Sequence, residues 1–197
     1  ITIPKGVTSI GYFVFCDCSS LERVTINCAN VGSWFSKPSS LKEIVLGEGV
    51  TSIGDYAFEY CSSLTTINIP ESVTSIGKSA FDGCSSLTAV HISSLEVWCN
   101  IDFASSSDNP LYYAKNLYLN GDLVTELTIP NSVTAIKNYA FRGCTSLTAI
   151  NIPAGVTSIG YGAFYGCSSL TAINIPEGVT SIGSGAFRGC SSLTAIT

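Results

Sequence analysis

The chain repeats itself every 23 residues, and this period constrains its fold more than any other feature. The segment SIGYGAFYGC at residues 158–167 returns as SIGSGAFRGC at residues 181–190. Counted from the leucine that follows the paired serines, one unit reads L-x-x-I-x-I-P-x-x-V-x-x-I-G-x-x-A-F-x-x-C-x-x. A unit of this length cannot bury an apolar face by itself, so copies must stack on one another as the coils of a solenoid.

Each part of the unit predicts a local structure. The stretch LTAINI is rich in branched apolar residues at alternate positions, which is typical of a short strand with one buried face, and the proline that follows ends the strand. The stretch VTSI is compatible with an extended or 3₁₀ segment, and GxxAFxGC predicts a single helical turn with its alanine, phenylalanine and cysteine pointing inward. Strands of successive coils would then form a parallel sheet with a spacing of about 4.8 Å.

The repeat closely resembles the leucine-rich repeats of the BspA type. The residues that carry the resemblance are SLTAINIPEGVTSIGSGAFRGC and its copies, which cover most of the chain. The resemblance implies a leucine-rich-repeat solenoid that is right-handed, with one parallel β-sheet on the concave face and short strand, 3₁₀ or helical turns on the convex side. It also implies a bacterial surface protein that binds other proteins, often in adhesion to a host.

The chain is expected to form a single repeat array over residues 1–197. It begins at Ile1 rather than methionine and ends inside a unit, so we expect a piece of a longer protein. Two stretches depart from the regular spacing, at residues 21–40 and 88–126.

Each irregular stretch predicts its own local structure. In the first, Trp34 and Phe35 are expected to take the place of the Ala-Phe pair. In the second, NLYLNG predicts a strand and a tight Asn-Gly turn, and ELTIP predicts the next strand. The stretch FASSSDNPLYY is expected to protrude as a loop, and loops on a rigid scaffold often carry function.

One position that holds glycine in the regular units holds a lysine in one unit. Glycine follows the second isoleucine of the VTSI stretch in the regular units, but Lys137 stands there once. Lysine tolerates a positive φ poorly. Either this position does not have a left-handed backbone, or Lys137 is strained.

The charge of the chain and the length of its apolar runs argue against nucleic-acid and membrane partners. Charged residues make up 12% of the chain, and the net charge is -5 with a pI of about 4.7. A nucleic-acid partner is not expected, because its binding needs a basic surface. Insertion of this segment into a membrane is not expected either, because no apolar run approaches the roughly 20 residues that span a bilayer.

The nine cysteines are an odd number, so they cannot all pair within the chain. Six of them occupy one position of the repeat: Cys18, Cys61, Cys84, Cys144, Cys167 and Cys190. Stacked side chains hold their Cβ atoms too far apart for easy bridging. We therefore predict a buried column of free thiols, with Cys16 exposed as the most reactive thiol of the chain.

No catalytic residue, metal site or cofactor is predicted. The single histidine, His91, stands at a repeat position that holds asparagine in other units and faces away from the core. No C-x-x-C pair supports a zinc site, no serine lies in a nucleophile-elbow motif, and the carboxylates are scattered. The chain is therefore not expected to be an enzyme.

A ligand is expected to bind the outward face of the strands and the irregular segment 91–118. Tyrosine is favoured there as an anchor, because it combines a large contact area with a polar tip. The candidate ligand-binding residues are His91, Trp98, Tyr112, Tyr113, Tyr118, Asn68, Asn151 and Asn174. The alternative for Trp98 and the tyrosines is that they fill the gap that the irregular repeat leaves.

The leading hypothesis is a non-enzymatic, extracellular or cell-surface recognition module that binds a protein or glycan, in adhesion or host interaction. The first alternative is a structural spacer of a cell-surface protein with no ligand of its own. The second is an ice-binding face, because one repeat position holds a regular row of threonines: Thr8, Thr51, Thr74, Thr134, Thr157 and Thr180. Both ends lack polar caps, so end-to-end self-association of this piece is also expected.

Overall fold

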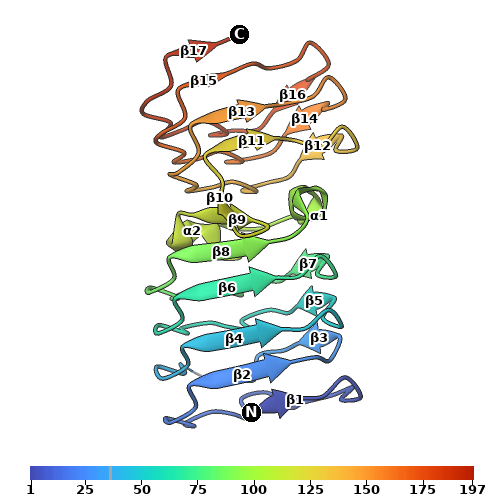
Figure 1. Cartoon of the computed structure of the whole chain (residues 1–197), viewed down its shortest axis with the longest axis vertical. Coiled ribbons are helices and arrows are strands. Elements are labelled where there is room, and N and C mark those ends of the chain that lie inside the picture. The colour runs from blue at the N-terminus through green and yellow to red at the C-terminus, as the bar shows by residue number, and fades with distance from the viewer. Residues whose placement is uncertain (36) are drawn as a thin grey trace.

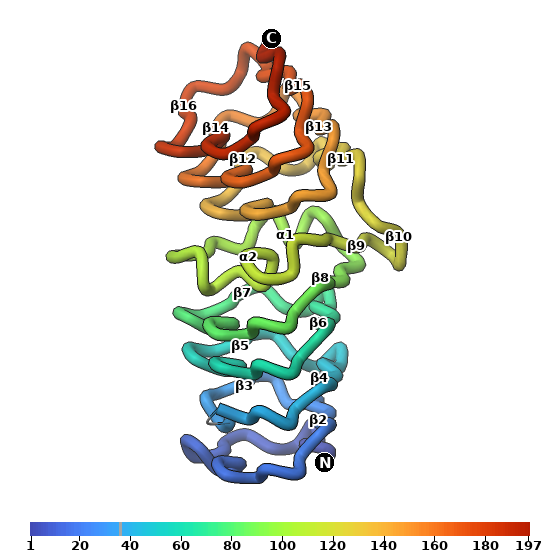
Figure 2. Tube along the Cα trace, turned by 90° about the vertical axis from the view of Figure 1, so that its left-hand side faces the viewer, coloured from blue at the N-terminus to red at the C-terminus, as the bar shows by residue number. Residues whose placement is uncertain are grey.

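The computed structural model describes residues 1–35 and 37–197, in which the chain winds into a right-handed solenoid (Figure 1). The coils pile up along one long axis, with the N-terminus at one end and the C-terminus at the other (Figures 1 and 2). A regular coil has three sides, which we call the main sheet, the second sheet and the turn side. This arrangement confirms the predicted fold.

The main sheet contains one strand from each coil. Its strands are β1 (Thr2–Ile3), β2 (Arg23–Ile26), β4 (Glu43–Leu46), β6 (Thr66–Ile69), β8 (Ala89–Ile92), β9 (Leu117–Leu119), β11 (Glu126–Thr128), β13 (Ala149–Asn151), β15 (Ala172–Ile173) and β17 (Ala195–Ile196). They pair in parallel in the orders β1-β2-β4, β6-β8-β9 and β11-β13-β15-β17. The register places equivalent residues side by side, such as Ile150 and Ile173, so the inward isoleucines form columns as predicted.

The VTSI stretches are extended rather than 3₁₀ and add a second parallel sheet to the one that was expected. Its strands are β3 (Asn30–Val31), β5 (Ser52–Ile53), β7 (Ser75–Ile76), β12 (Ala135–Ile136), β14 (Ser158–Ile159) and β16 (Ser181–Ile182). They pair in the orders β3-β5-β7 and β12-β14-β16. Threonine hydroxyls beside these strands donate to carbonyls of the preceding coil, for example Thr157 to Thr134 at 3.1 Å and Thr180 to Thr157 at 3.3 Å. The threonine row is therefore engaged in local hydrogen bonds that join the coils.

The prediction of a helical turn in GxxAFxGC is wrong. The turn side is a run of tight turns with two left-handed residues four positions apart, such as Tyr56 at φ 56° and Tyr60 at φ 57°. Its backbone N–H groups donate to the next coil: Phe58 donates to the carbonyl of Ala80 at 2.9 Å. The turn side is thus held by hydrogen bonds between coils. In a helical turn, the same N–H groups would instead donate to carbonyls within the turn.

The core consists of stacked columns of like side chains. The ring centroids of Phe141 and Phe164 lie 5.4 Å apart, and those of Phe164 and Phe187 lie 5.6 Å apart. In the short second coil, Phe35 is buried and stacks 5.4 Å from Phe15, while Trp34 is buried beside it. The prediction that these two aromatic residues replace the Ala-Phe pair is confirmed.

The cysteine column is present as free thiols from the third coil onward. Cys61, Cys84, Cys144, Cys167 and Cys190 are buried. The Sγ of Cys167 donates to the carbonyl of Phe141 at 3.2 Å, and Cys84 and Cys190 make equivalent bonds to the preceding coil. Burial raises the pKa of Cys167 well above its usual range, and the neighbouring thiols raise it further.

Two predictions about the first coil need correction. Cys18 shares the repeat position of the buried column but is exposed, and Cys16 is half-buried rather than exposed. Cys18 is therefore the more accessible of the two thiols.

The glycine that Lys137 replaces is required for close approach of coils and not for backbone conformation. Neither Gly160 nor Gly183, nor Lys137 itself, has a positive φ. A Cβ at Gly160 would lie 2.6 Å from the backbone nitrogen of Asn138 in the preceding coil. The coil of Lys137 instead follows the irregular segment, where helix α1 (Leu95–Asn100) contacts β12. Lys137 therefore faces the bridging helix α1 and not a regular coil of the kind that Gly160 approaches.

The close approach of two coils at Gly160 makes this position sensitive to substitution. Replacing Gly160 with alanine is expected to lower the free energy of unfolding by about 1–3 kcal/mol, because the clash is with backbone and two coils must move apart. Replacing Gly155 with alanine is the matched control, since its Cβ would meet its nearest neighbour, the carbonyl of Asn131, at an ordinary 3.6 Å. Urea denaturation of both variants measures the difference. Equal losses in the two variants would contradict the close-approach explanation.

The stretch FASSSDNPLYY does not protrude, as was predicted, but folds into the stack. Phe103, Asp108, Asn109 and Leu111 are fully buried, and the stretch ends in helix α2 (Leu111–Ala114). We call residues 93–116, which include α1 and α2, the bridging segment. It lies between the N-terminal coils and the C-terminal coils (Figure 1).

Toward the N-terminal coils, the bridging segment accepts the hydrogen bonds that the next regular coil would otherwise accept. The backbone N–H of Ser79 donates to Oδ1 of Asp108 at 2.8 Å, that of Phe81 to the carbonyl of Ser107 at 3.3 Å, and that of Gly83 to the hydroxyl of Tyr113 at 2.9 Å. In a regular coil these donors bond to carbonyls of the next coil. The irregular sequence therefore supplies the acceptors that a regular unit would have supplied.

Toward the C-terminal coils, side chains of the bridging segment donate hydrogen bonds to the first regular coil, in the place of a preceding regular coil. The indole N–H of Trp98 donates to the carbonyl of Ala140 at 2.9 Å, and the Asn109 amide donates to the carbonyl of Tyr139 at 2.8 Å. Trp98 also packs 5.5 Å from the ring of Phe103. The two stacks of regular coils are thus joined through side chains. None of the helices in the described residues is long and apolar enough to cross a bilayer.

Candidate ligand-binding surface

A row of polar and aromatic side chains crosses the outer face of the main sheet. The parallel register aligns Asn68 on β6 with His91 on β8, and His91 with Tyr118 on β9. The rings of His91 and Tyr118 stack with centroids 4.6 Å apart and planes 23° apart, and both residues are half-buried. The structure therefore brings three of the predicted site residues together, and we call them the His91 row.

A β-hairpin projects beside the His91 row. Strand β9 turns at Asn120 and Gly121, both with positive φ, and returns as the short antiparallel strand β10 (Asp122–Leu123). Figure 2 shows β10 standing away from the stack of coils. The predicted strand and Asn-Gly turn are confirmed. The ELTIP stretch also forms a strand, but it is β11, which pairs with β13 and not with β9.

The hairpin divides the main sheet into two surfaces. Within the described residues, β9 and β11 do not pair, and β10 lies at the edge of β9 instead. Asn151 on β13 and Asn174, which follows β15, are exposed on the C-terminal part. These two predicted residues are therefore separated from the His91 row by the interruption in the sheet.

Trp98 does not belong to the surface. It is 1% exposed and holds the two stacks together, so its prediction as a ligand contact is wrong and the gap-filling alternative is correct. The hydroxyl of Tyr113 donates to Oδ1 of Asp82 at 3.0 Å, and burial, with a smaller contribution from Asp82, raises the pKa of Tyr113. Tyr112 packs edge-on against Tyr113 and lies near Arg142 on the turn side. The tyrosines of α2 thus join the bridging segment to the turns.

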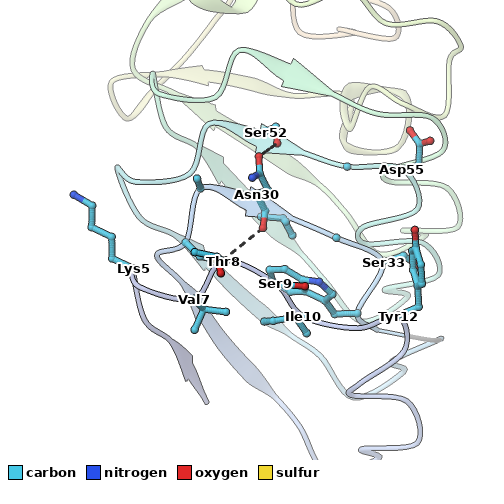
Figure 3. A pocket seen from close by; sticks show the side chains of 16 residues that line it. Lys5, Val7, Thr8, Ser9, Ile10, Tyr12, Asn30, Ser33, Ser52 and Asp55 are labelled. Carbon is cyan, nitrogen blue, oxygen red and sulfur yellow. Dashed lines mark hydrogen bonds between the residues drawn. The ribbon is translucent and has the colours of Figure 1, made fainter.

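A groove that the sequence did not predict opens near the N-terminus, between the first coil and β3 (Figure 3). It has a volume of about 630 Å³ and is lined by Thr8, Tyr12, Asn30, Ser33, Trp34 and Asp55, among others. The cause is a mismatch in length, because the second coil, residues 21–40, is shorter than its neighbours. That short spacing was the sequence signal that could have revealed the groove.

Where the groove opens, the described residues lack hydrogen bonds that join neighbouring coils elsewhere in the second sheet. The N–H of Thr51 donates to the carbonyl of Ala29 at 2.7 Å, and that of Gly54 to the carbonyl of Val31 at 2.7 Å. The equivalent N–H groups one coil earlier, on Ala29 and Gly32, have no acceptor within residues 1–35 and 37–197. The groove is therefore polar along its strand edge.

Metal-ligating residues do not cluster in the part of the chain that the structure describes: no group of three or more histidine, cysteine, aspartate or glutamate side chains is placed to hold an ion. Burial raises the pKa of the Cys99 thiol to about 12. Such a thiol stays protonated at neutral pH and is a poor ligand and nucleophile.

Comparison with known proteins supports the repeat assignment. The sequence profile described as BspA type leucine rich repeat region matches residues 1–108 and 113–197, in six copies. A leucine-rich repeat protein from Eubacterium ventriosum is 27% identical, with a TM-score of 0.56 over 100% of this chain and 59% of that protein's chain. One from Bacteroides ovatus is 25% identical, with a TM-score of 0.59 over 100% of this chain and 60% of the other. The chain therefore spans about three fifths of the length of these structures. No curated protein matches it significantly.

Proposed function

The chain belongs to the BspA-type leucine-rich repeat family, and from that premise we propose that it is a non-enzymatic recognition module of a bacterial surface protein. It binds an extracellular protein partner through the His91 row and the β9–β10 hairpin. Family membership supports a recognition role, and the geometry of the main sheet supports the position of the binding surface.

The observation that carries the proposal is the stacked pair of His91 and Tyr118 beside the projecting hairpin. Two aromatic rings in contact form a preorganised patch, since each restrains the other before a ligand arrives. Leu123, at the end of the hairpin, is 42% exposed and adds apolar area next to the patch. An aromatic centre bordered by polar and apolar side chains is the usual composition of an interface hot spot.

Substitutions in the His91 row test the proposal. Binding of the purified chain to a panel of extracellular-matrix proteins and mucins is measured first. Replacing both His91 and Tyr118 with alanine is expected to weaken the binding found by at least about tenfold, as for interface hot spots. Replacing Thr128 with alanine, at an exposed position of β11, is the control and should leave binding unchanged. No binding by the parent chain, or equal binding by the double variant, would contradict the proposal.

A spacer role is the second candidate, and the C-terminal coils favour it. Ala149, Ala172 and Ala195 align on the outer face of the main sheet, which leaves a surface with few side chains able to anchor a partner. If the array only sets a distance, removing one regular coil should impair adhesion of the whole protein, while the double variant of His91 and Tyr118 should not.

A further inference from the structure

We propose that the turn side of the C-terminal coils holds a second binding site, formed by Lys115, Arg142, Tyr165 and Arg188, for a linear acidic polysaccharide. We call these four residues the arginine column. The site lies on a different side of the coils from the His91 row, and it uses none of the residues proposed to bind the protein partner.

The core of the site is a tyrosine between two guanidinium groups. Arg142, Tyr165 and Arg188 occupy the same repeat position in three consecutive coils. The guanidinium carbon of Arg142 lies 3.9 Å from the ring centroid of Tyr165, and that of Arg188 lies 5.7 Å from it. The two arginines are therefore held at a spacing of two coils, which is about 10 Å.

Further aromatic rings fix the position of Arg142. Its guanidinium carbon lies 5.4 Å from the ring centroid of Tyr112 and 5.7 Å from that of Tyr139. Gly162 leaves space for the ring of Tyr139, since a Cβ at that glycine would lie 3.2 Å from two ring carbons. Packing against aromatic faces orients the planar guanidinium without using its hydrogen-bond donors on an acceptor.

Lys115 adds a third positive charge close to Arg142. Its Nζ lies 5.1 Å from the ring centroid of Tyr112 and donates to the Tyr112 carbonyl. Lys115 is exposed, but partial burial of its ammonium group lowers its pKa, and the charge of Arg142 lowers it further. The two cations are thus held together at an electrostatic cost that a bound anion would offset.

The described residues provide no counter-charge for this cluster. The ion pairs in the described part of the chain are Arg23 with Glu43 and Lys42 with Glu22, all in the N-terminal coils. Within residues 1–35 and 37–197, the guanidinium N–H groups of Arg142 and Arg188 have no hydrogen-bond acceptor. The Nε of Arg142 is also shielded from solvent.

Two acidic residues of the junction with the bridging segment are already engaged in hydrogen bonds. Asp108 is fully buried and accepts three hydrogen bonds, from the N–H of Ser79 and from the N–H and hydroxyl of Ser105. Asp82 accepts a hydrogen bond from Tyr113. In a chain with a net charge of -5, an unpaired group of three cations is a local site for an anion.

The arrangement along the axis favours a linear polymer over a single small ion. Guanidinium groups bind carboxylate and sulfate in the same bidentate way. Arginines repeated along the column match anionic groups repeated along a polysaccharide. Tyr161 is 50% exposed, packs 5.2 Å from Tyr139, and offers a ring face on which a sugar can stack. The equivalent repeat positions in the N-terminal half hold Glu59 and Asp82, which would repel an anion and confine the polymer to the C-terminal coils.

Binding of defined polysaccharides by the whole chain tests the site. Alginate supplies carboxylates, dextran sulfate supplies sulfates, and neutral dextran is the uncharged control. We expect at least one acidic polymer to bind and neutral dextran not to bind. The stronger of alginate and dextran sulfate identifies the anion. Replacing Arg142 and Arg188 together with glutamine should weaken binding by at least about tenfold, as expected for the loss of charge-assisted hydrogen bonds.

Matched variants separate this site from charge in general and from the His91 row. Replacing both arginines with lysine keeps the charge but loses the planar fork, and should give an intermediate loss. Arg23→Gln removes a distant cation and should have no effect, as should the double alanine variant of His91 and Tyr118. Circular dichroism and urea denaturation confirm that each variant is folded.

Three results would overturn the proposal. They are failure of both acidic polymers to bind, equal binding by the parent chain and the double glutamine variant, and binding of polyglutamate as tight as that of the polysaccharides. A failure here leaves the proposal for the His91 row intact, because the two sites share no residue.

Discussion

Replacing Trp98 with alanine is expected to lower the free energy of unfolding by about 3–5 kcal/mol. Trp98 is 1% exposed, so its removal leaves a large cavity between the two stacks of coils. It also removes the hydrogen bond from the indole N–H to the carbonyl of Ala140 at 2.9 Å. Since each coil of a repeat array is stabilised by its neighbours, we expect the weakened junction to separate unfolding into two transitions. Urea denaturation followed by far-ultraviolet circular dichroism measures both effects.

Two other substitutions control for this result. Trp98→Phe keeps most of the volume and should cost about 1 kcal/mol, because the Ala140 carbonyl also accepts from Asn109 at 3.2 Å. Tyr12→Ala removes an aromatic side chain that is 82% exposed and should change stability by less than about 0.5 kcal/mol. A loss below about 1 kcal/mol for Trp98→Ala would show that the bridging segment does not couple the stacks through this residue.

Replacing Asp108 with alanine is expected to cost about 2–4 kcal/mol. Oδ1 of Asp108 accepts from the N–H of Ser79 at 2.8 Å, and Oδ2 accepts from the N–H of Ser105 at 2.7 Å. Alanine would leave both donors without an acceptor where the last regular N-terminal coil meets the bridging segment. Urea denaturation measures the loss, and hydrogen exchange should show faster exchange of the Ser79 amide.

Asp122 provides the matched control for Asp108. It is exposed on β10, and replacing it with alanine should change stability by less than about 0.5 kcal/mol. If Asp108→Ala and Asp122→Ala had the same small effect, then Asp108 would not be the acceptor that completes the turn side at this junction.

The regular coils were predictable because one physical requirement acts on every copy. An isoleucine such as Ile150 must be buried on the next coil, so a 23-residue period fixes both the strand and its register. The position of His91 on the outer face followed from the same alternation. Its contact with Tyr118 did not, because the pairing of β8 with β9 crosses an irregular spacing of the chain.

The bridging segment was not predictable for a different reason. Polar residues such as Asp108 and Asn109 in the stretch FASSSDNPLYY suggested an exposed loop. They are buried because the backbone groups of the adjacent coils need acceptors and donors at that level of the stack. A repeat pattern shows where a unit is missing but not which side chains satisfy the backbone groups that the missing unit leaves.

The turn side shows the same limit. The sequence GxxAFxGC satisfies the requirement for an inward phenylalanine and cysteine either as a helical turn or as successive tight turns. Hydrogen bonds between coils, such as that from Phe141 to Ala163 at 2.8 Å, select the second arrangement. It also places Arg142 and Arg188 in an outward column, which the residue types alone did not indicate.

Alkylation of cysteines in the native protein, located by peptide mass spectrometry, tests the stacking of coils most directly. At neutral pH, under reducing conditions, we predict modification of Cys18 and slower modification of Cys16. The buried thiols of the column, Cys61, Cys84, Cys144, Cys167 and Cys190, should react only after unfolding in urea. Reaction of these column thiols as fast as that of Cys18 in the native protein would contradict the in-register solenoid.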